Sequence, residues 1–142
     1  MKSLLGRLGV VLFIVGLIIF GNIEVWGADW KLLGTTEESE FFYDTASIVR
    51  PSGNIIRVWV SHVYNEKGVN TWVKKLGEQF ENLDYCLELV EFDCAKRKMR
   101  LLSAQYYSKD GNIIQSHEFP KPSWWSVRPE KIDGSLYKGV CK

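Results

Sequence analysis

The stretch Asn54–Tyr64, with the sequence NIIRVWVSHVY, is typical of one long β-strand because it is rich in β-branched and aromatic residues. One face of such a strand would carry Ile56, Val58, Val60, His62 and Tyr64. The other face would carry Ile55, Arg57, Trp59, Ser61 and Val63. Because the first face is the more apolar of the two, we expect it to point into the core.

Shorter stretches on both sides of this strand also predict strands. Before it lie Asp29–Thr36 and Ser39–Thr45, followed by a turn signal at Arg50–Asn54. After it, strands are predicted at Asp84–Asp93, Arg97–Ser108 and Asn112–Phe119. The last two are joined through Asp110-Gly111, a strong hairpin signal. The strands therefore predict a meander of about six antiparallel strands.

The periodicity becomes helical after Gly68. A stripe at helical spacing runs through Val69, Trp72, Val73, Leu76, Phe80 and Leu83. Asn70 is a candidate N-cap, and Gly77 weakens the helix from within. We expect the stripe to pack on the sheet rather than on a membrane or a partner. A short helix over Ser135–Val140, with Ser135 as its N-cap, ends the chain. The predicted fold class is α+β, with a single antiparallel sheet, one amphipathic helix against it and a short C-terminal helix.

The N-terminus reads as a signal peptide. Lys2 and Arg7 precede the unbroken apolar run Gly9–Phe20, which is shorter than the ~20 residues that span a bilayer. Small residues favour cleavage before Ala28, which gives a signal peptide over 1–27 and one domain over 28–142. The alternative is an uncleaved N-terminal anchor. No membrane span is expected in the mature chain, whose net charge falls from +1 to zero without residues 1–27.

Three cysteines matter in an oxidising compartment. Cys86 and Cys94 lie on one predicted strand, which holds them roughly 26 Å apart and prevents them from bonding to each other. One of them should pair with Cys141, and Cys94 is the better candidate because it lies at a turn. Cys86 is then either a small buried residue or a free thiol available for intermolecular pairing.

Signatures of catalysis and of cofactor binding are missing from the sequence. It has no GxSxG, no HExxH and no glycine-rich phosphate loop. It also has no CxxC, and both histidines, His62 and His117, lie within strand-like runs, so we expect no metal site and no cofactor. The small net charge gives no reason to expect nucleic acid as a partner. The protein is therefore not expected to be an enzyme.

Two features suggest contacts with a partner. Trp124 and Trp125 lie in the proline-rich segment Phe119–Glu130, and neighbouring residues of an extended segment point in opposite directions. The outward ring, with Trp59 and Tyr107, would form an aromatic contact patch; the alternative is a lid with both rings buried. The second feature is a basic cluster at Lys96, Arg97, Lys98 and Arg100. It is either a site for a polyanion or acidic partner, or a turn and strand edge kept soluble by charge.

Three stretches carry a resemblance to a known family. FFYDTASIVRPSGNIIRVWV (41–60), EFDCAKRKMRLLSAQYYSKDGNII (91–114) and VRPEKIDGSLYKGVCK (127–142) resemble the surface-adhesin protein E family. The resemblance implies a single antiparallel sheet with a helix against it, a Cys94–Cys141 disulfide and a bacterial envelope location. It leaves a homodimer open. Characterised members are adhesins that bind host extracellular-matrix and serum proteins, whereas for many others "adhesin" is only a label.

Together these observations favour a secreted envelope protein with a non-catalytic role in binding or adhesion through a protein partner. The alternative is a periplasmic accessory or structural protein of an envelope assembly, without adhesive activity. A small enzyme or ligand carrier is a third reading, which the absence of converging polar groups in the sequence disfavours.

Overall fold

The computed structural model describes residues 28–142, so the expected signal peptide over 1–27 lies outside the described residues. In the described part, one sheet is built from β1 (Trp30–Thr35), β2 (Ser39–Asp44), β3 (Val49–Ser52), β4 (Ile55–Tyr64), β5 (Leu83–Asp93), β6 (Lys98–Ser108), β7 (Ile113–Glu118) and β8 (Trp125–Ser126). Two α-helices accompany it, α2 (Glu66–Leu76) and α3 (Ile132–Val140). The predicted α+β class is confirmed.

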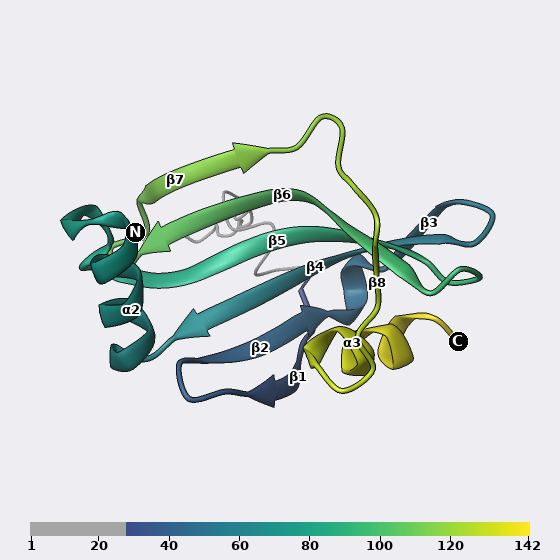
Figure 1. Ribbon diagram of the computed structural model, residues 1–142, viewed down its shortest axis with the longest axis horizontal. Helices are drawn as coiled ribbons and strands as arrows, with labels where there is room; N and C mark the ends of the chain where they lie inside the picture. The colour runs from purple at the N-terminus through teal and green to yellow at the C-terminus, as the bar shows by residue number, and fades with distance from the viewer. Residues whose placement is uncertain (1–27) are drawn as a thin grey trace, which may run out of the picture.

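All pairings in the sheet are antiparallel, and its main path runs β1-β2-β4-β5-β6-β7 (Figure 1). This path is the predicted meander of six strands. Two short strands were not predicted. β3 pairs with the start of β4, and β8 pairs with the start of β6. Arg50–Asn54 was expected to be only a turn, but Val49–Ser52 pairs with β4 because Gly53, at φ +49°, closes a tight hairpin.

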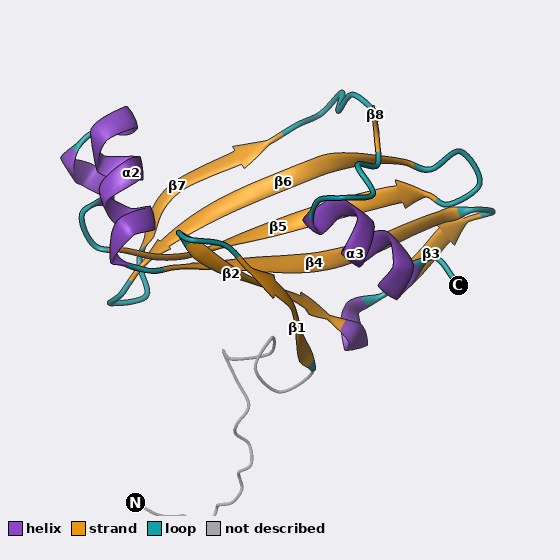
Figure 2. Ribbon diagram, turned by 60° about the horizontal axis from the view of Figure 1, so that its bottom comes forward, coloured by secondary structure: helices purple, strands orange, loops and turns teal. Residues whose placement is uncertain are grey.

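The core lies on one face of the sheet, under α3, and we call this the helix face. Its centre is the predicted apolar face of β4, where Ile56, Val58 and Val60 are at most 3% exposed. Leu136 and Val140 of α3 pack against this cluster, which also contains Tyr43, Val90, Phe92 and Met99. Figure 2 shows α3 lying across this face and α2 at the far end of the sheet. The predicted orientation of β4 is therefore confirmed.

Helix α2 begins earlier and ends sooner than the sequence predicted. Its N-cap is Asn65, whose side chain accepts the amide hydrogen of Gly68 at 2.9 Å, and not Asn70. The helix ends at Leu76 because Gly77 adopts φ +108°, which a helix cannot continue through. Phe80 belongs to a separate short turn, Glu78–Phe80, and is fully buried. Trp72 joins α2 to the sheet through contacts with the rings of Tyr64 and Tyr106, and it also contacts the ring of Phe80.

Helix α3 begins at Ile132 rather than at Ser135. Ser135 lies exposed inside the helix, and the first turn is instead stabilised by Asp133, whose Oδ2 accepts a hydrogen bond from Arg128 Nε at 2.7 Å. At its other end α3 is tied to the sheet by the Cys94–Cys141 disulfide, with a Cα–Cα distance of 5.5 Å. The predicted pairing of cysteines is confirmed.

Neither helix among residues 28–142 has both the length and the apolar character that a membrane crossing requires.

Candidate binding groove

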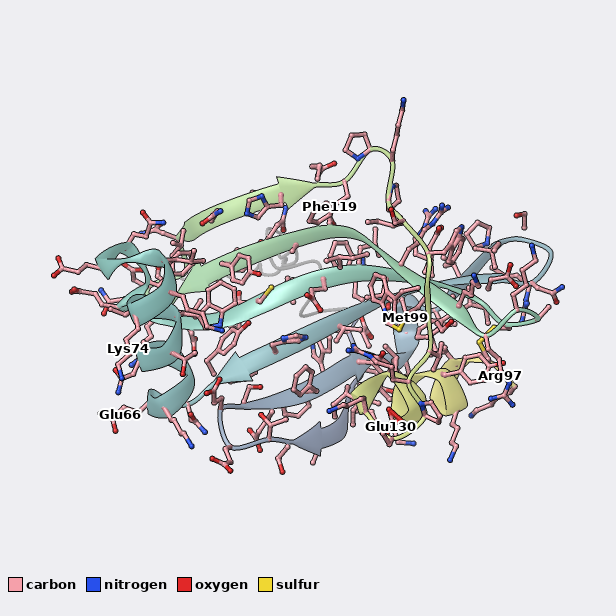
Figure 3. All side chains as sticks on the ribbon, in the orientation of Figure 1. Glu66, Lys74, Arg97, Met99, Phe119 and Glu130 are labelled. Carbon is pink, nitrogen blue, oxygen red and sulfur yellow. A yellow bond between two sulfur atoms is a disulfide. The ribbon has the colours of Figure 1, made fainter. Side chains whose placement is uncertain are left out.

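A groove of about 380 Å³ opens on the helix face, beside α3. Its apolar floor comes from neighbouring strands of the sheet: Phe41 of β2, Val60 of β4, Val90 of β5, and Met99 and Leu101 of β6. Ile132 and Leu136 of α3 form one wall. Figure 3 places Met99 beside the segment that runs from β8 towards α3. The groove exists because α3 and α2 cover the two ends of this face and leave the middle open.

Two polar residues lie in this otherwise apolar floor. Nε2 of His62 and Oε1 of Glu88 are 2.9 Å apart, and each side chain is about one fifth exposed, at 21% and 20%. The ring of Phe41 packs against the imidazole, with the centroids 4.1 Å apart. The half-buried pair therefore satisfies part of its own hydrogen bonding and stays open to a ligand in the groove.

The rim of the groove carries an aromatic ring and charged side chains. Trp125 of β8 is 37% exposed and pairs in register with Met99. Arg128 is held by the largely buried carboxylate of Asp133, while Lys131 has no ion pair among those found in residues 28–142. The groove thus combines an apolar floor, an exposed indole and one unpaired ammonium group, which is the composition of a binding site.

A buried cysteine lies next to the polar pair of the groove. Cys86 is the register partner of His62, and it is fully buried. Burial, and then the negative charge of Glu88, raises the pKa of the Cys86 thiol well above its ordinary value, so the thiol stays protonated. Within the described chain, no group of three or more His, Cys, Asp or Glu side chains is arranged to hold a metal ion.

The predicted aromatic patch is divided between the two faces of the sheet. Trp125 lines the groove, whereas Trp124 stacks on Arg100 of the opposite, uncovered face, with the guanidinium 4.2 Å from the ring centre. Adjacent tryptophans thus point in opposite directions, and neither is fully buried. Trp59 and Tyr107 also lie on the uncovered face. Strand geometry places them roughly 15 Å apart, and Tyr107 stacks on Tyr85.

Sequence reasoning missed most of the groove. The one available signal was His62, a polar residue on the strand face predicted to enter the core. Glu88 carried no signal in the sequence, because its proximity to His62 depends on the register between β4 and β5. Arg128 and Lys131 reach the groove only because the chain crosses the sheet before α3 (Figure 1).

Comparison with known proteins gives one match, to a family model. The model described as surface-adhesin protein E matches residues 30–142, which is nearly all of the described chain. Neither the curated proteins nor the solved structures contain a match. The match spans the sheet, both helices and the disulfide, which are the parts that the sequence resemblance had indicated. The chain therefore belongs to the surface-adhesin protein E family.

Proposed function

We propose that this protein is a secreted, non-catalytic binding protein of the bacterial envelope, and that its groove holds a segment of a protein partner. Membership of a surface-adhesin family supports a role in binding. The observation that carries the proposal is Trp125, a large aromatic side chain left 37% exposed at the rim of a concave apolar site. Exposed tryptophans in such positions are frequent anchors of protein interfaces.

The polar groups of the groove are positioned before a partner binds. His62 contacts Glu88, and Arg128 contacts Asp133, so these groups are held in fixed positions. A partner segment that inserts an aromatic or aliphatic side chain would cover the floor formed by Val60, Val90 and Leu101. Lys131 would then meet an acidic or carbonyl group at the rim.

The two neighbouring tryptophans provide a matched test. Trp125→Ala removes an aromatic side chain from the groove, and Trp124→Ala removes the same group from the other face. Both variants would be assayed for binding to a panel of immobilised extracellular-matrix and serum proteins, after thermal unfolding shows that they are folded. We expect Trp125→Ala to weaken binding at least tenfold, as for an interface anchor, and Trp124→Ala to leave it within about twofold. Equal losses would exclude the groove as the contact site.

The location of the protein has a separate test. Intact cells would be treated with protease and probed for the mature chain beside a periplasmic control. Loss of the protein while the control survives supports a surface location and an adhesive role. Protection equal to that of the control would instead favour the periplasmic accessory function. Sequencing of the mature N-terminus should find Ala28 if residues 1–27 are a cleaved signal peptide.

A further inference from the structure

The end of the molecule opposite α2 is built from three segments that are far apart in the sequence. The disulfide joins the β5–β6 turn to the end of α3, with Cα atoms of Cys94 and Cys141 at 5.5 Å. The hydroxyl of Tyr137 also donates to the Cys94 carbonyl at 2.6 Å. The amide of Cys94 donates to the Asn54 carbonyl at 3.0 Å, which fixes the β3–β4 turn to the same place.

These three segments gather exposed cations at one end of the sheet. We call this set the basic end; it consists of Arg50, Lys96, Arg97, Lys98, Lys138 and Lys142. The set contains three residues of the basic cluster seen in the sequence, and the fold adds three more from other segments. Figure 3 shows Arg97 beside the disulfide and the last turn of α3.

The cations of the basic end differ from the other arginines of the sheet. Arg57 and Arg100 both form ion pairs with Glu91, and Arg128 forms one with Asp133. In the described chain, no ion pair involves a member of the basic end. Arg97 lies over the ring of Tyr137 at 5.2 Å, and Arg50 donates to the Gly53 carbonyl. The positive charge of this end is therefore available to an anion from outside.

The attraction between the basic end and an anion would be local, because residues 28–142 have no net charge. At physiological ionic strength, charges are screened over about 8 Å, so acidic residues at the α2 end do not cancel the field of the basic end. Glu37, Glu66 and Glu78 are among these distant acids. Within the basic end, Asp93 is the acid at the β5–β6 turn, and its carboxylate accepts the amide hydrogen of Lys96 at 3.1 Å.

The composition of the basic end favours a linear polyanion over a folded protein. Four of its six cations are lysines, and lysine is depleted at the centres of protein interfaces. Its members lie in β3, in the β5–β6 turn, at the start of β6 and at the end of α3, outside the groove described above. Separate point charges suit a chain of repeated anionic groups, which needs no matching pocket. The disulfide and the hydrogen bond from Cys94 to Asn54 hold the three segments in place before binding, which lowers the entropy lost on association.

We propose that the basic end binds a sulfated polysaccharide, with the sulfate groups lying between cations of the three segments. This is a second binding activity, on a different surface from the groove, and it does not depend on the function proposed above. The interaction consists of several weak charge contacts, so it should weaken steeply as salt rises.

Heparin is the probe for the test, with the mature chain, disulfide intact, as the protein. Binding would be measured for the wild type, for Lys96→Gln/Lys98→Gln, and for the control Lys74→Gln/Lys75→Gln on α2. Figure 3 places Lys74 at the opposite end of the molecule from Arg97. The control makes the same change of charge. We expect heparin binding to weaken about fivefold or more in the first variant and to stay within about twofold in the control.

A second variant tests the same surface independently, in case the first variant does not fold. Lys138→Gln/Lys142→Gln changes a different segment of the same surface and should also weaken heparin binding about fivefold. Equal losses in the α2 control, or no binding of heparin by the wild type at physiological salt, would overturn the proposal.

Two further probes identify the anion. Hyaluronan, which has carboxylates but no sulfates, and poly-glutamate would compete against labelled heparin. We expect both to compete at least tenfold more weakly than unlabelled heparin. If poly-glutamate competes equally well, the basic end recognises acidic polypeptide, and the assignment to sulfated polysaccharide is wrong.

Discussion

Arg57 and Glu91 face each other directly across β4 and β5, and Oε2 of Glu91 accepts hydrogen bonds from Nη2 and Nε of Arg57 at 2.7 and 3.0 Å. Oε1 of the same carboxylate accepts two more hydrogen bonds from Arg100 of β6, at 2.9 and 3.0 Å. Glu91 is only 3% exposed. One carboxylate thus links three strands on the uncovered face of the sheet.

The ionisation of Glu91 should make folding stability depend on pH. Burial by itself raises the pKa of this carboxyl, but the hydrogen bonds and charges of Arg57 and Arg100 outweigh burial, so its pKa is lowered. A lowered pKa stabilises the folded state above the ordinary glutamate pKa of about 4.3, and this contribution is lost as pH falls through the folded-state value.

We therefore expect Glu91→Gln to lower the free energy of unfolding at pH 7 by about 1–3 kcal/mol, because two arginines lose a charged partner. The difference from the wild type should shrink as pH falls below about 4. Urea unfolding at pH 7 and pH 3.5 measures both effects, with the exposed Glu40→Gln as the control. A constant difference at both pH values would show that packing, rather than charge, explains the loss.

Removal of the disulfide should destabilise the protein strongly. Cys94 and Cys141 are separated by 47 positions, and closing a loop of that length restricts the unfolded chain by about 4 kcal/mol. The double variant Cys94→Ser/Cys141→Ser should lose about this much in a urea titration. Peptide mapping without reduction should identify the linked peptides directly. A peptide that joins Cys86 to Cys141 would contradict the structure.

Cys86 should be a free thiol that does not react in the folded protein. It is fully buried between β4 and β6, and burial raises its thiol pKa. We expect no labelling by a thiol reagent at pH 8 over an hour, and labelling of one thiol per chain after addition of denaturant. Rapid labelling without denaturant, or dimers linked through Cys86 on a non-reducing gel, would contradict this prediction.

The N-cap of α2 is Asn65 in the structure, whereas the sequence favoured Asn70. Asn65 accepts the Gly68 amide hydrogen and also donates to the Glu37 carbonyl at 2.8 Å. Asn65→Ala should therefore lower the free energy of unfolding by about 1–2 kcal/mol. Asn70→Ala, inside the helix and exposed, should leave stability unchanged or slightly higher. If thermal unfolding showed a larger loss of stability for Asn70→Ala than for Asn65→Ala, Asn70 would be the N-cap.

Gly68 should not tolerate alanine, although alanine usually stabilises a helix. A Cβ atom at Gly68 would lie 2.3 Å from the carbonyl oxygen of Glu38, and the backbone cannot move away without shifting α2. We expect Gly68→Ala to destabilise the protein by about 1–3 kcal/mol. Lys74→Ala, at an exposed site of the same helix, should change stability by less than about 0.5 kcal/mol. Chemical denaturation compares the two variants. If Gly68→Ala were more stable than the wild type, the backbones of Gly68 and Glu38 would have to lie further apart than in the structure.

Much of the fold was predictable because it depends on local patterns. The alternation in Asn54–Tyr64 gave the core-facing side of β4, and Asp110-Gly111 gave the β6–β7 hairpin. The spacing of Cys86 and Cys94 on one strand left Cys141 as the partner for one of them. These inferences need only the period of a strand and the short reach of a disulfide.

The ends of both helices were mispredicted because two local signals competed. Asn65 and Asn70 are both good N-caps. The helix begins after Asn65 because the backbone of Asn65 and Gly68 packs against the carbonyl of Glu38. Ser135 is also a good cap, yet α3 begins earlier because Asp133 pairs with Arg128. β3 and β8 escaped prediction because strands of two to four residues carry almost no periodic signal.

By itself the sequence determined the six strands of the main path, the inward face of β4, Cys94 as the better partner for Cys141, and the resemblance to the family. The tertiary structure alone decided which side chains meet across strands and turns. His62 meets Glu88 because of the β4–β5 register, Trp125 enters the groove because β8 pairs with β6, and Lys142 joins Lys96 because the disulfide closes a long loop. The physical reason is that periodicity fixes the direction of a side chain within its own element, whereas binding surfaces are formed by register and packing between elements distant in the chain.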